Sequence, residues 1–594
     1  MASFWKRTHK CNDLRKAHVG QEVSLLGWVQ RSRDHGGLTF IDLRDRTGLV
    51  QVVFDPAEGD DTHKLAQRLR SEYVIAIKGT VSARPEGTVN TNLATGEVEV
   101  RATGLQLLNK SEVPPFLVED DMDTSEDLRM KYRYLDLRRP KMYKNLELRH
   151  KVIKVLRDYY DEQGFLEIET PVLYKSTPET GAREYVVPSR VNPGQFYALP
   201  QSPQQLKQTL MISGVERYFQ VARCFRDEDL RADRQPEFTQ LDFEMSFIDQ
   251  EDIFNLVEPA VCRVMKQVLG MDIPSPFPRM TYAESMLRYG NDKPDTRFGL
   301  EIKDISDIAK KVEFSVFAKT VEAGGVVRGV CAPGCAGYTR SQLDKLTDFA
   351  KQMGAKGMAW MKVTETGIET PIAKFFKDEE VKAILSVFDA KPGDLICFIA
   401  DKADTTADVC GRLRLHFGDE LKLRTPGVFN YLWITDMPLL EYREEDKMFK
   451  ARHHPFTSPR EEDVPLLDSD PTNARANAYD LVLNGTELGG GSIRIHDAEL
   501  QKKMFSIFGV TEEEAATKFG FFIEALKFGA PPHGGMAIGL DRFVMLLTGS
   551  QSIRDVIAFP KNQKAQCVMS DAPSPVALKL MRELHIKSTV QPQS

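Results

Sequence analysis

The stretch from Tyr218 to Phe247 holds the densest set of residues suited to chemistry. Its halves, YFQVARCF and EFTQLDFEMSF, alternate apolar with polar or small residues, which predicts two β-strands that each turn one face to a core. An ordinary half-exposed hairpin also explains the alternation, but it explains the residue types less well. The Arg226 guanidinium suits a phosphate, the Phe238 ring a base and the Asp242 carboxylate a small substrate. Together they indicate a nucleotide site on an open antiparallel sheet.

A second group of such residues lies in YDLVLNGTELGGGSIRIH, residues 479–496. Asp480 and Glu487 would face opposite ways on an uninterrupted strand, so we expect a bulge or turn at Asn484-Gly485 to bring them to one side. Two carboxylates beside a polyphosphate suit Mg²⁺. The glycines that follow allow a ligand close to the backbone, and Arg494 offers a planar fork for a carboxylate.

The segment GGMAIGLDRFVMLL, residues 534–547, predicts a strand, a glycine break and a helix with one apolar face. Arg542 falls in the first turn of that helix, where free N–H groups also favour a phosphate. Upstream, His453 and His454 have no further ligand nearby, which favours a solvated or substrate-facing histidine over a metal site.

These motifs resemble those of one enzyme family. FRDEDLRADRQPEFTQLD resembles motif 2 of the class II aminoacyl-tRNA synthetases, in its bacterial aspartyl-tRNA synthetase form, and GGMAIGLDRFVMLL resembles motif 3. A helix from Leu146 and the strand FLEIETPVL resemble motif 1, which implies a homodimer. The resemblance covers nearly the whole chain. It implies that ATP activates L-aspartate to aspartyl-adenylate, which is then transferred to the 3′ end of tRNA(Asp).

The resemblance also implies roles for individual residues. Arg226 and Arg542 would be catalytic, through the α- and γ-phosphates, and Asp480 and Glu487 would bind Mg²⁺. The residues implied for aspartate binding are Glu179, Ser202, Gln204, Lys207, Arg226, Asp242, His453 and Arg494. Those implied for ATP binding are Arg226, Asp227, Glu228, Gln235, Phe238, Glu487, Gly539, Leu540, Asp541 and Arg542. The loop STPETGAREY departs from the family's STPEGA by an added Thr180, which bears on the placement of Glu179.

Residues 20–108 contain five short alternating segments separated by turn signals, which predicts a small closed barrel of the OB type. Ile41 would point into this barrel and Phe40 out of it. An exposed Phe near arginines suits stacking on an unpaired base, although lone surface aromatic residues are common. The barrel resembles the anticodon-binding domain of aspartyl-tRNA synthetases, which implies that Arg33, Phe40 and Gln51 contact the anticodon.

Two residues bear on the choice of tRNA. In this family, a His in the HGG segment and a Gly in the RPEG segment accompany enzymes that charge both tRNA(Asp) and tRNA(Asn); here they are His35 and Gly87. A small residue and an adaptable donor near the anticodon would tolerate either third base. We favour both tRNAs over tRNA(Asp) alone, and such an enzyme needs an amidotransferase partner to convert Asp-tRNA(Asn).

Several rivals share parts of this pattern. Asparaginyl- and lysyl-tRNA synthetases have the same architecture, but asparagine beside Lys207 and Arg494 would leave two buried charges unpaired. A synthetase paralogue that charges no tRNA would not need the anticodon-type barrel. A non-catalytic RNA-binding protein would not need Arg226, Glu487 and Arg542.

With 594 residues, the chain is too long for one core. We expect an α+β multidomain protein, with an N-terminal OB-fold β-barrel and a class II catalytic domain on an antiparallel sheet with an inserted α+β domain. The expected parts are the barrel (1–108), a linker (109–140), the first catalytic part (141–289), the insertion (290–424), the second catalytic part (425–555) and a C-terminal extension (556–594). In the insertion we expect strands at KVEFSVFAK and LICFIAD and helices at SQLDKLTDFAKQM and EVKAILSVF.

The composition, 42% hydrophobic and 28% charged residues, is that of an ordinary globular protein. No run of 18 apolar residues and no signal peptide occurs. A net charge of −7 argues against a general polyanion binder, so a nucleic acid would be bound through local patches and shape. The eight cysteines lack CxxC spacing and are best explained as free thiols in a reducing cytosol. We therefore expect a cytoplasmic protein.

Overall fold

The computed structural model describes residues 5–177, 182–445 and 447–590. Contacts within the chain divide it into two compact units, Met1–Arg149 with Arg554–Pro575 and His150–Ile553 with Val576–Ser594. Within the described ranges, no helix combines the length and apolar character needed to cross a membrane.

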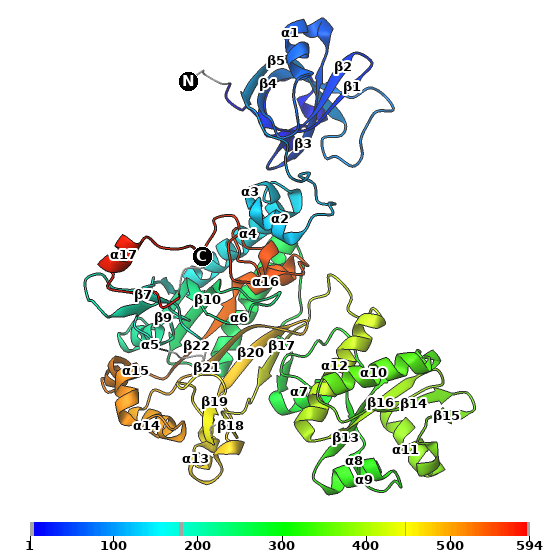
Figure 1. Ribbon diagram of the computed structural model, residues 1–594, viewed down its shortest axis with the longest axis vertical. Coiled ribbons are helices and arrows are strands. Elements are labelled where there is room, and N and C mark those ends of the chain that lie inside the picture. The colour runs from blue at the N-terminus through cyan, green and yellow to red at the C-terminus, as the bar shows by residue number, and fades with distance from the viewer. Residues whose placement is uncertain (1–4, 178–181, 446, 591–594) are drawn as a thin grey trace. The chain divides into compact units, whose positions relative to one another are not determined.

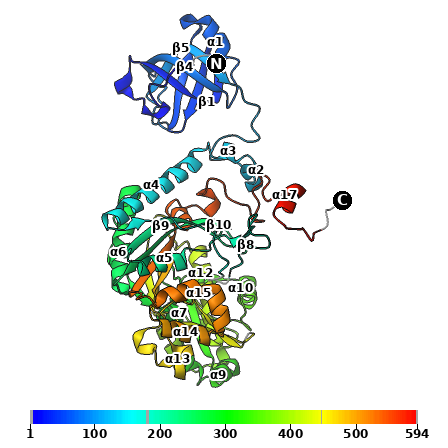
Figure 2. The same cartoon turned by 90° about the vertical axis from the view of Figure 1, so that its left-hand side faces the viewer.

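A closed five-stranded barrel begins the first unit (Figures 1 and 2). Its strands pair in the order β1-β2-β3-β5-β4, and β1 also pairs with β4 to close the barrel. Ile41 is fully buried whereas Phe40 beside it is partly exposed, as the alternation predicts. The predicted OB-type barrel is thus confirmed. Its elements are β1 (Glu22–His35), β2 (Leu38–Asp45), β3 (Gly48–Phe54), α1 (Asp60–Ala66), β4 (Val74–Ala83) and β5 (Val98–Asn109).

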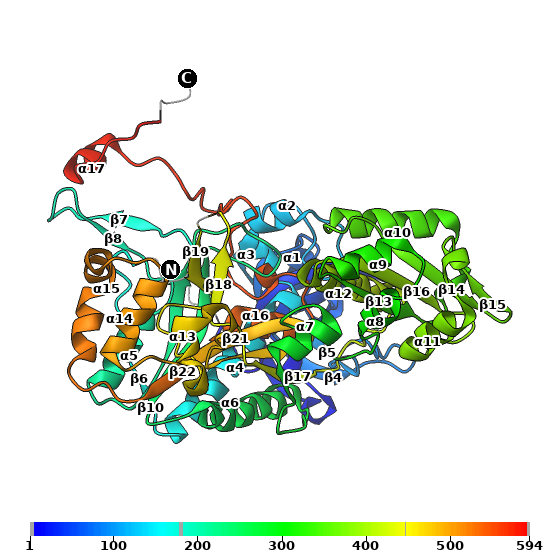
Figure 3. The same cartoon turned by 90° about the horizontal axis from the view of Figure 1, so that it is seen from below.

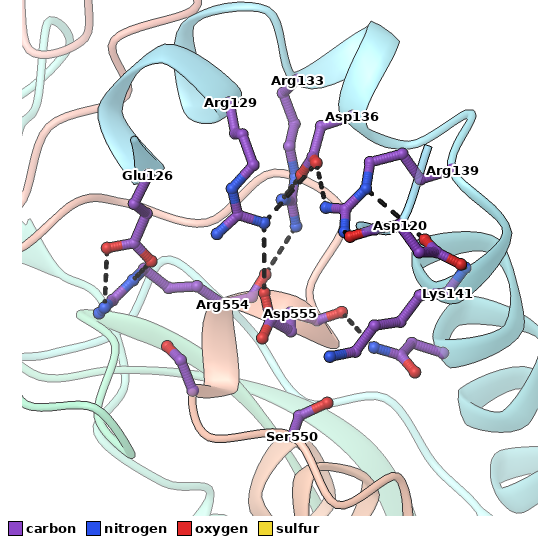
Figure 4. Close-up of polar contacts among 12 residues, drawn as sticks. Asp120, Glu126, Arg129, Arg133, Asp136, Arg139, Lys141, Ser550, Arg554 and Asp555 are labelled. Carbon is purple, nitrogen blue, oxygen red and sulfur yellow. Dashed lines mark hydrogen bonds and ion pairs between the residues drawn. The ribbon is translucent and has the colours of Figure 1, made fainter. Parts of the chain in front are cut away.

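A buried cluster of ions follows the barrel in the first unit (Figure 4). Asp136 is fully buried and accepts hydrogen bonds from Arg133 at 2.6 Å and from Arg139 at 2.7 Å. Arg133 also donates to the backbone carbonyls of Arg554 at 2.6 Å and Ile557 at 2.8 Å. The cluster therefore fastens the helices after the barrel to a segment some 421 residues later. Those helices are α2 (Glu126–Lys131), α3 (Arg133–Asp136) and the start of α4 (Pro140–Glu162).

The second unit is built on an eight-stranded sheet with the order β11-β17-β20-β21-β22-β10-β9-β6. The six central strands are antiparallel, as predicted, while the short edge pairs β11–β17 and β6–β9 are parallel. The sheet is therefore mixed at its edges. Its strands are β6 (Leu166–Glu167), β9 (Arg217–Phe225), β10 (Glu237–Ser246), β11 (Arg279–Thr281), β17 (Tyr431–Thr435), β20 (Ala478–Leu483), β21 (Thr486–Ile493) and β22 (His533–Gly539).

The two faces of β10 explain how this sheet carries a site. On one face its aromatic side chain Phe243 lies 5.3 Å, centre to centre, from the ring of Tyr160 on α4, and Tyr160 also stacks on Phe219 of β9. On the other face Asp242 and Glu244 are buried as well. One face thus belongs to an apolar core, and the other presents buried polar groups.

The strand predicted at FLEIETPVL is much shorter than expected. Only Leu166–Glu167 pairs, in parallel with β9, and the chain beyond it is irregular. Pro171 lacks the N–H that a longer ladder would need. Leu166, Val172 and Leu173 remain 47–57% exposed.

Residues 303–420 form a second, five-stranded sheet with the order β12-β13-β16-β14-β15 (Figure 3). The predicted strand LICFIAD and both predicted helices are confirmed as β16, α10 and α11. The strand predicted at KVEFSVFAK is wrong, because Ser315–Glu322 forms helix α9. Phe314 and Phe317, three residues apart, make a ring contact there at 5.0 Å. The elements are β12 (Lys303–Asp304), α8 (Ser306–Ala309), α9 (Ser315–Glu322), β13 (Val326–Ala332), α10 (Arg340–Gln352), β14 (Ala359–Thr364), β15 (Gly367–Glu369), α11 (Asp378–Phe388), β16 (Leu395–Asp401) and α12 (Ala403–Glu420).

Further helices and two hairpins complete the second unit. Phe505 of α14 and Phe519 of α15 stack at 5.3 Å, so these helices lie side by side (Figure 3). The remaining elements are β7 (Val186–Pro188), β8 (Phe196–Ala198), α5 (Gln204–Ile212), α6 (Gln250–Val264), α7 (Tyr282–Tyr289), β18 (Leu440–Arg443), β19 (Met448–Ala451), α13 (Leu466–Ser469), α14 (Ala498–Ile507), α15 (Glu512–Leu526), α16 (Leu540–Leu547) and α17 (Leu578–Glu583).

Candidate active site

A cavity of 480 Å³ opens on the polar face of the eight-stranded sheet, among β10, β21, β22 and the start of α16. It brings together most of the residues predicted for binding aspartate, ATP and a metal ion. Those that line it are Ser202, Gln204, Lys207, Arg226, Glu228, Gln235, Phe238, Asp242, His453, Asp480, Glu487, Arg494, Gly539, Asp541 and Arg542.

Arg226 and Phe238 stand at the two ends of the loop between β9 and β10. The Arg226 backbone N–H donates to the Pro236 carbonyl at 2.9 Å, which closes the loop. The Arg226 guanidinium lies 5.1 Å from the centre of the Phe238 ring, and its buried Nε has no hydrogen-bond partner among the described residues. A ring face beside a cation with an unused donor suits a base and a phosphate.

Three buried charges, Lys207, Asp242 and Arg494, line the cavity, and a fourth, Glu244, pairs with two of them. Lys207 Nζ donates to Asp242 at 3.0 Å and lies 3.3 Å from Glu244. Arg494 pairs with Glu244 through two nitrogens, at 2.8 and 3.1 Å. All four residues are at most 2% exposed. Glu244 was not predicted, although it lies two residues beyond Asp242 and so on the same strand face.

The two carboxylates of this network, Asp242 and Glu244, differ in their pKa and in whether all their oxygens are paired. Burial raises the pKa of Asp242 to about 6 despite the nearby Lys207. Burial alone would raise the pKa of Glu244 too, but Arg494 and Lys207 outweigh it and hold that pKa below its usual value. Asp242 Oδ1 and the Gln204 amide nitrogen have no partner among the described residues. These two orphaned groups are available to a ligand.

Arg494 uses its donors on the protein itself. Its Nη1 donates to His454 Nε2 at 2.6 Å and to Ser492 Oγ at 2.7 Å, in addition to the fork with Glu244. Burial, followed by the charge of Arg494, lowers the pKa of His454 well below its usual value, so the ring is neutral and can accept. Its Nη2 also donates to the Gly535 carbonyl at 3.2 Å, so Arg494 must exchange one of these partners to contact a substrate. Lys207, by contrast, keeps a third donor position open.

His453 faces the cavity with a buried Nε2 that has no partner within the described part of the chain. Burial, followed by Arg452, lowers its pKa to about 4, so this ring is also neutral near pH 7. The structure thus places a neutral donor or acceptor at the cavity wall, consistent with a substrate-facing histidine.

The carboxylates of Asp480 and Glu487 meet across the hairpin of β20 and β21. The turn predicted at Asn484-Gly485 is present, with both residues at positive φ, and a bulge follows Leu481. Burial, followed by Glu487, raises the pKa of Asp480 well above its usual value. A Cβ at Gly490 would lie 2.4 Å from Asp480 Oδ1, which explains the glycine.

This pair fits a divalent cation, since two adjacent carboxylates repel each other unless a proton or cation lies between them. Among the described residues no cluster of three or more His, Cys, Asp or Glu side chains is placed to hold a metal ion. The remaining ligands would therefore be phosphate or water oxygens.

Arg542 lies in the first turn of α16, as predicted. Its Nη1 donates to the Glu487 carbonyl at 2.8 Å, and its Nη2 pairs with Asp233 at 3.2 Å. The neighbouring Asp541 accepts a hydrogen bond from the Thr239 backbone at 2.6 Å, which ties the helix to β10. Asp233 was not predicted, because a carboxylate in a charged loop has no spacing that marks it.

Some predicted residues lie elsewhere. Asp227 is exposed and forms an isolated backbone β-bridge with Arg183, and Leu540 is fully buried. Neither lines the cavity. Glu179 and the added Thr180 lie outside the described residues.

The predicted anticodon residues gather on the outside of the barrel. Arg33 pairs across the strands with Phe40, and Asp42 with Gln51, so these side chains share one face. Arg33 and Asp42 also form an ion pair at 2.9 Å, and Gln51 donates to Glu99 at 3.0 Å. His35 is exposed at the end of β1, and Gly87 occupies an exposed turn at φ +80°.

Comparison with known proteins agrees with this geometry. A family model described as "tRNA synthetases class II (D, K and N)" matches residues 125–563, and one described as "OB-fold nucleic acid binding domain" matches residues 23–108. An aspartate–tRNA(Asp/Asn) ligase of Geotalea uraniireducens (strain Rf4) is 57% identical over 587 residues, covering 99% of each chain. One of Symbiobacterium thermophilum is 57% identical over 593 residues, covering 98% of this chain and 100% of the relative.

Among solved structures, asparaginyl-tRNA synthetase from Pyrococcus horikoshii in complex with asparaginyl-adenylate has a TM-score of 0.59. It is 18% identical, with 94% of this chain and 98% of that chain covered, so it supports the fold alone. The predicted resemblance is confirmed by the relatives. Enzymes of this class use ATP as a substrate. The chain belongs to the class II tRNA synthetases of the D, K and N group.

Proposed function

We propose that this chain is an aspartate–tRNA ligase. The strongest support is the buried network of Lys207, Asp242 and Arg494, which line the cavity, with Glu244 behind them as their counter-ion. Lys207 offers an ammonium donor to a side-chain carboxylate, and Asp242 Oδ1 an acceptor to an α-ammonium. The full-length relatives named aspartate–tRNA(Asp/Asn) ligase support the same substrate.

The reaction needs no covalent nucleophile from the protein. The α-carboxylate of aspartate attacks the α-phosphorus of ATP, and pyrophosphate leaves as aspartyl-adenylate forms. Arg226 stabilises charge at the α-phosphate and Arg542 at the γ-phosphate, while Phe238 stacks on the adenine. A ribose hydroxyl at the 3′ end of the tRNA then attacks the mixed anhydride and releases AMP.

Asp480 and Glu487 would hold Mg²⁺, which when bound neutralises part of the phosphate charge. Their proximity and the raised pKa of Asp480 support this assignment. Without a cation, the two carboxylates would repel a polyphosphate.

Further expectations concern partners and setting. The exposed Leu166, Val172 and Leu173 support a homodimer through the segment that resembles motif 1. Eight free cysteines are consistent with the cytoplasm. We also propose that both tRNA(Asp) and tRNA(Asn) are charged, supported by exposed His35 and Gly87 and by the names of the relatives. Charging tRNA(Asn) would couple the enzyme to an amidotransferase.

The test is aminoacylation with labelled aspartate on separate tRNA(Asp) and tRNA(Asn) transcripts. Charging of both supports the full proposal. Charging of tRNA(Asp) alone leaves the ligase and removes any role of His35 and Gly87 in relaxed specificity. Charging of neither would contradict the proposed function.

A further inference from the structure

We propose that Asp233 is an exchangeable counter-ion of Arg542, which competes with the terminal phosphate of ATP and with pyrophosphate. This inference rests on the proposed function and adds a residue to it. Asp233 belongs to the loop between β9 and β10, whereas Arg542 belongs to α16, 309 residues later. Their ion pair at 3.2 Å is therefore a long-range contact across the mouth of the cavity that both residues line.

The Arg542 guanidinium has two partners, one of them a fixed backbone carbonyl and the other a side chain that can rotate. The Glu487 carbonyl accepts from Nη1 at 2.8 Å and is part of the rigid β21 strand. The Asp233 carboxylate faces Nη2 at 3.2 Å, and the buried Nε has no partner within the described part of the chain. Phosphate oxygens prefer the same fork of nitrogens. The Glu487 carbonyl can keep its hydrogen bond to Nη1 when a phosphate binds Arg542. The Asp233 carboxylate cannot keep its place, because the phosphate needs Nη2.

The exchange requires little movement. The Ala232 carbonyl next to Asp233 accepts a hydrogen bond from the Ile553 backbone at 2.9 Å, which anchors the loop backbone at this point. The Asp233 side chain is 39% exposed and that of Arg542 is 24% exposed, so rotation of the carboxylate into water breaks the pair. A partly exposed ion pair is weak, which suits a contact that is replaced in each catalytic cycle.

The competition predicts a direction. Asp233→Asn keeps the side-chain shape but removes the anion, so phosphate binding at Arg542 no longer has to displace a charge. We expect Kd for ATP to fall by about 2- to 5-fold, with the same change for pyrophosphate. AMP has no γ-phosphate, and its Kd should stay the same. In steady-state pyrophosphate exchange, KM for ATP should fall without a rise in kcat.

The experiment is titration calorimetry of the full chain with ATP, pyrophosphate and AMP, with melting temperatures to verify folding. Asp229→Asn is the matched control, because Asp229 lies in the same loop, is exposed and makes no hydrogen bond or ion pair with the described residues. It should leave all three affinities unchanged. Asp233→Glu keeps the charge, so its Kd values for all three ligands should stay close to those of the unmodified protein. If Asp233→Asn does not fold, Asp233→Ser takes its place.

The inference would be overturned by weaker ATP binding in Asp233→Asn, by an equal gain in affinity for AMP, or by an equal gain in affinity for ATP in Asp229→Asn. Weaker binding would mean that Asp233 holds Arg542 in place for the phosphate. Unchanged ATP binding in Asp233→Asn would also contradict it, while leaving the ligase function intact. Failure of the unmodified protein to bind ATP would instead contradict the proposed function.

Discussion

Two groups of buried ions, one in each compact unit, have opposite characters. In the first unit, Asp136 is 0% exposed and both its oxygens accept from arginines, at 2.6 and 2.7 Å. In the second, Lys207, Asp242, Glu244 and Arg494 are equally buried, yet Asp242 Oδ1 has no partner among the described residues. Both groups carry the desolvation cost of buried charges.

The presence or absence of an unpaired buried polar atom distinguishes a structural group of charges from one that can bind a ligand. Both oxygens of Asp136 are satisfied by arginines of the same chain, and Arg133 in turn donates to the backbone carbonyls of residues 554 and 557. Around Asp242, burial has raised the pKa to about 6 and left an acceptor that faces a 480 Å³ cavity. An orphaned buried acceptor is costly unless a ligand satisfies it. Burial alone therefore does not distinguish the two groups, whereas the pattern of satisfied bonds does.

The largest expected effect is on the structural group. Asp136→Asn leaves Arg133 and Arg139 without their buried anion, and we expect the free energy of unfolding to fall by about 3–5 kcal/mol. Denaturant unfolding measures it. Pyrophosphate exchange per folded molecule should not change. Asp161→Asn, at an exposed position of α4, is the control that should have little effect on stability. A loss of exchange in folded Asp136→Asn would erase the distinction.

Arg226→Ala tests the functional side. Because Arg226 faces the cavity with an unused Nε, its loss should lower aspartate-dependent pyrophosphate exchange by about 10²- to 10³-fold with little change in stability. Arg223→Ala, three residues earlier and within β9, is the matched control, because its guanidinium pairs with Glu237 at 2.8 Å and its side chain is 43% exposed. Near-normal exchange in Arg226→Ala would remove Arg226 from the mechanism.

Glu244→Gln sharpens the comparison, because Glu244 is satisfied like Asp136 but serves the site. The variant keeps the shape and removes the charge that orients Arg494, which should raise KM for aspartate by an amount equal to about 1–3 kcal/mol. The value of kcat should change less, and Glu244→Asp should recover part of the affinity. If stability falls while KM stays the same, Glu244 is a structural ion only.

The smallest effect is a pH dependence. Since the pKa of Asp242 is about 6, its carboxylate is charged at pH 7 and becomes protonated as the pH falls towards 5. Protonation removes the acceptor for the substrate ammonium, so KM for aspartate should rise by at most about tenfold per pH unit. His453, with a pKa of about 4, stays neutral over this range and does not contribute. A flat KM from pH 7 to 5 would contradict this assignment, as would the same profile in Asp242→Asn.

The sequence predicts those parts of the site that local patterns encode. Alternation in residues 237–246 predicts the two faces of β10, and Asn484-Gly485 predicts the turn that joins Asp480 to Glu487. It does not predict how donors are shared. Arg494 looks like a fork for substrate, yet Glu244, His454 and Ser492 occupy its nitrogens. Such sharing depends on contacts between distant strands.

The two incorrect strand predictions also arise from contacts between segments that are distant in the sequence. The segment KVEFSVFAK alternates well enough for a strand, but the packing of Phe317 into a buried position selects helix α9. FLEIETPVL has strand composition, yet only two of its residues find a pairing partner in β9. Tertiary partners decide short apolar segments of this kind.

The most direct measurement is ATP–pyrophosphate exchange with aspartate, asparagine and lysine supplied separately to the purified full chain. With Lys207 and Asp242 at the floor of the cavity, exchange should depend on aspartate and be at least about 10²-fold weaker with the other two amino acids. Equal exchange with asparagine or lysine, or none with aspartate, would contradict the assignment of this cavity to aspartate activation.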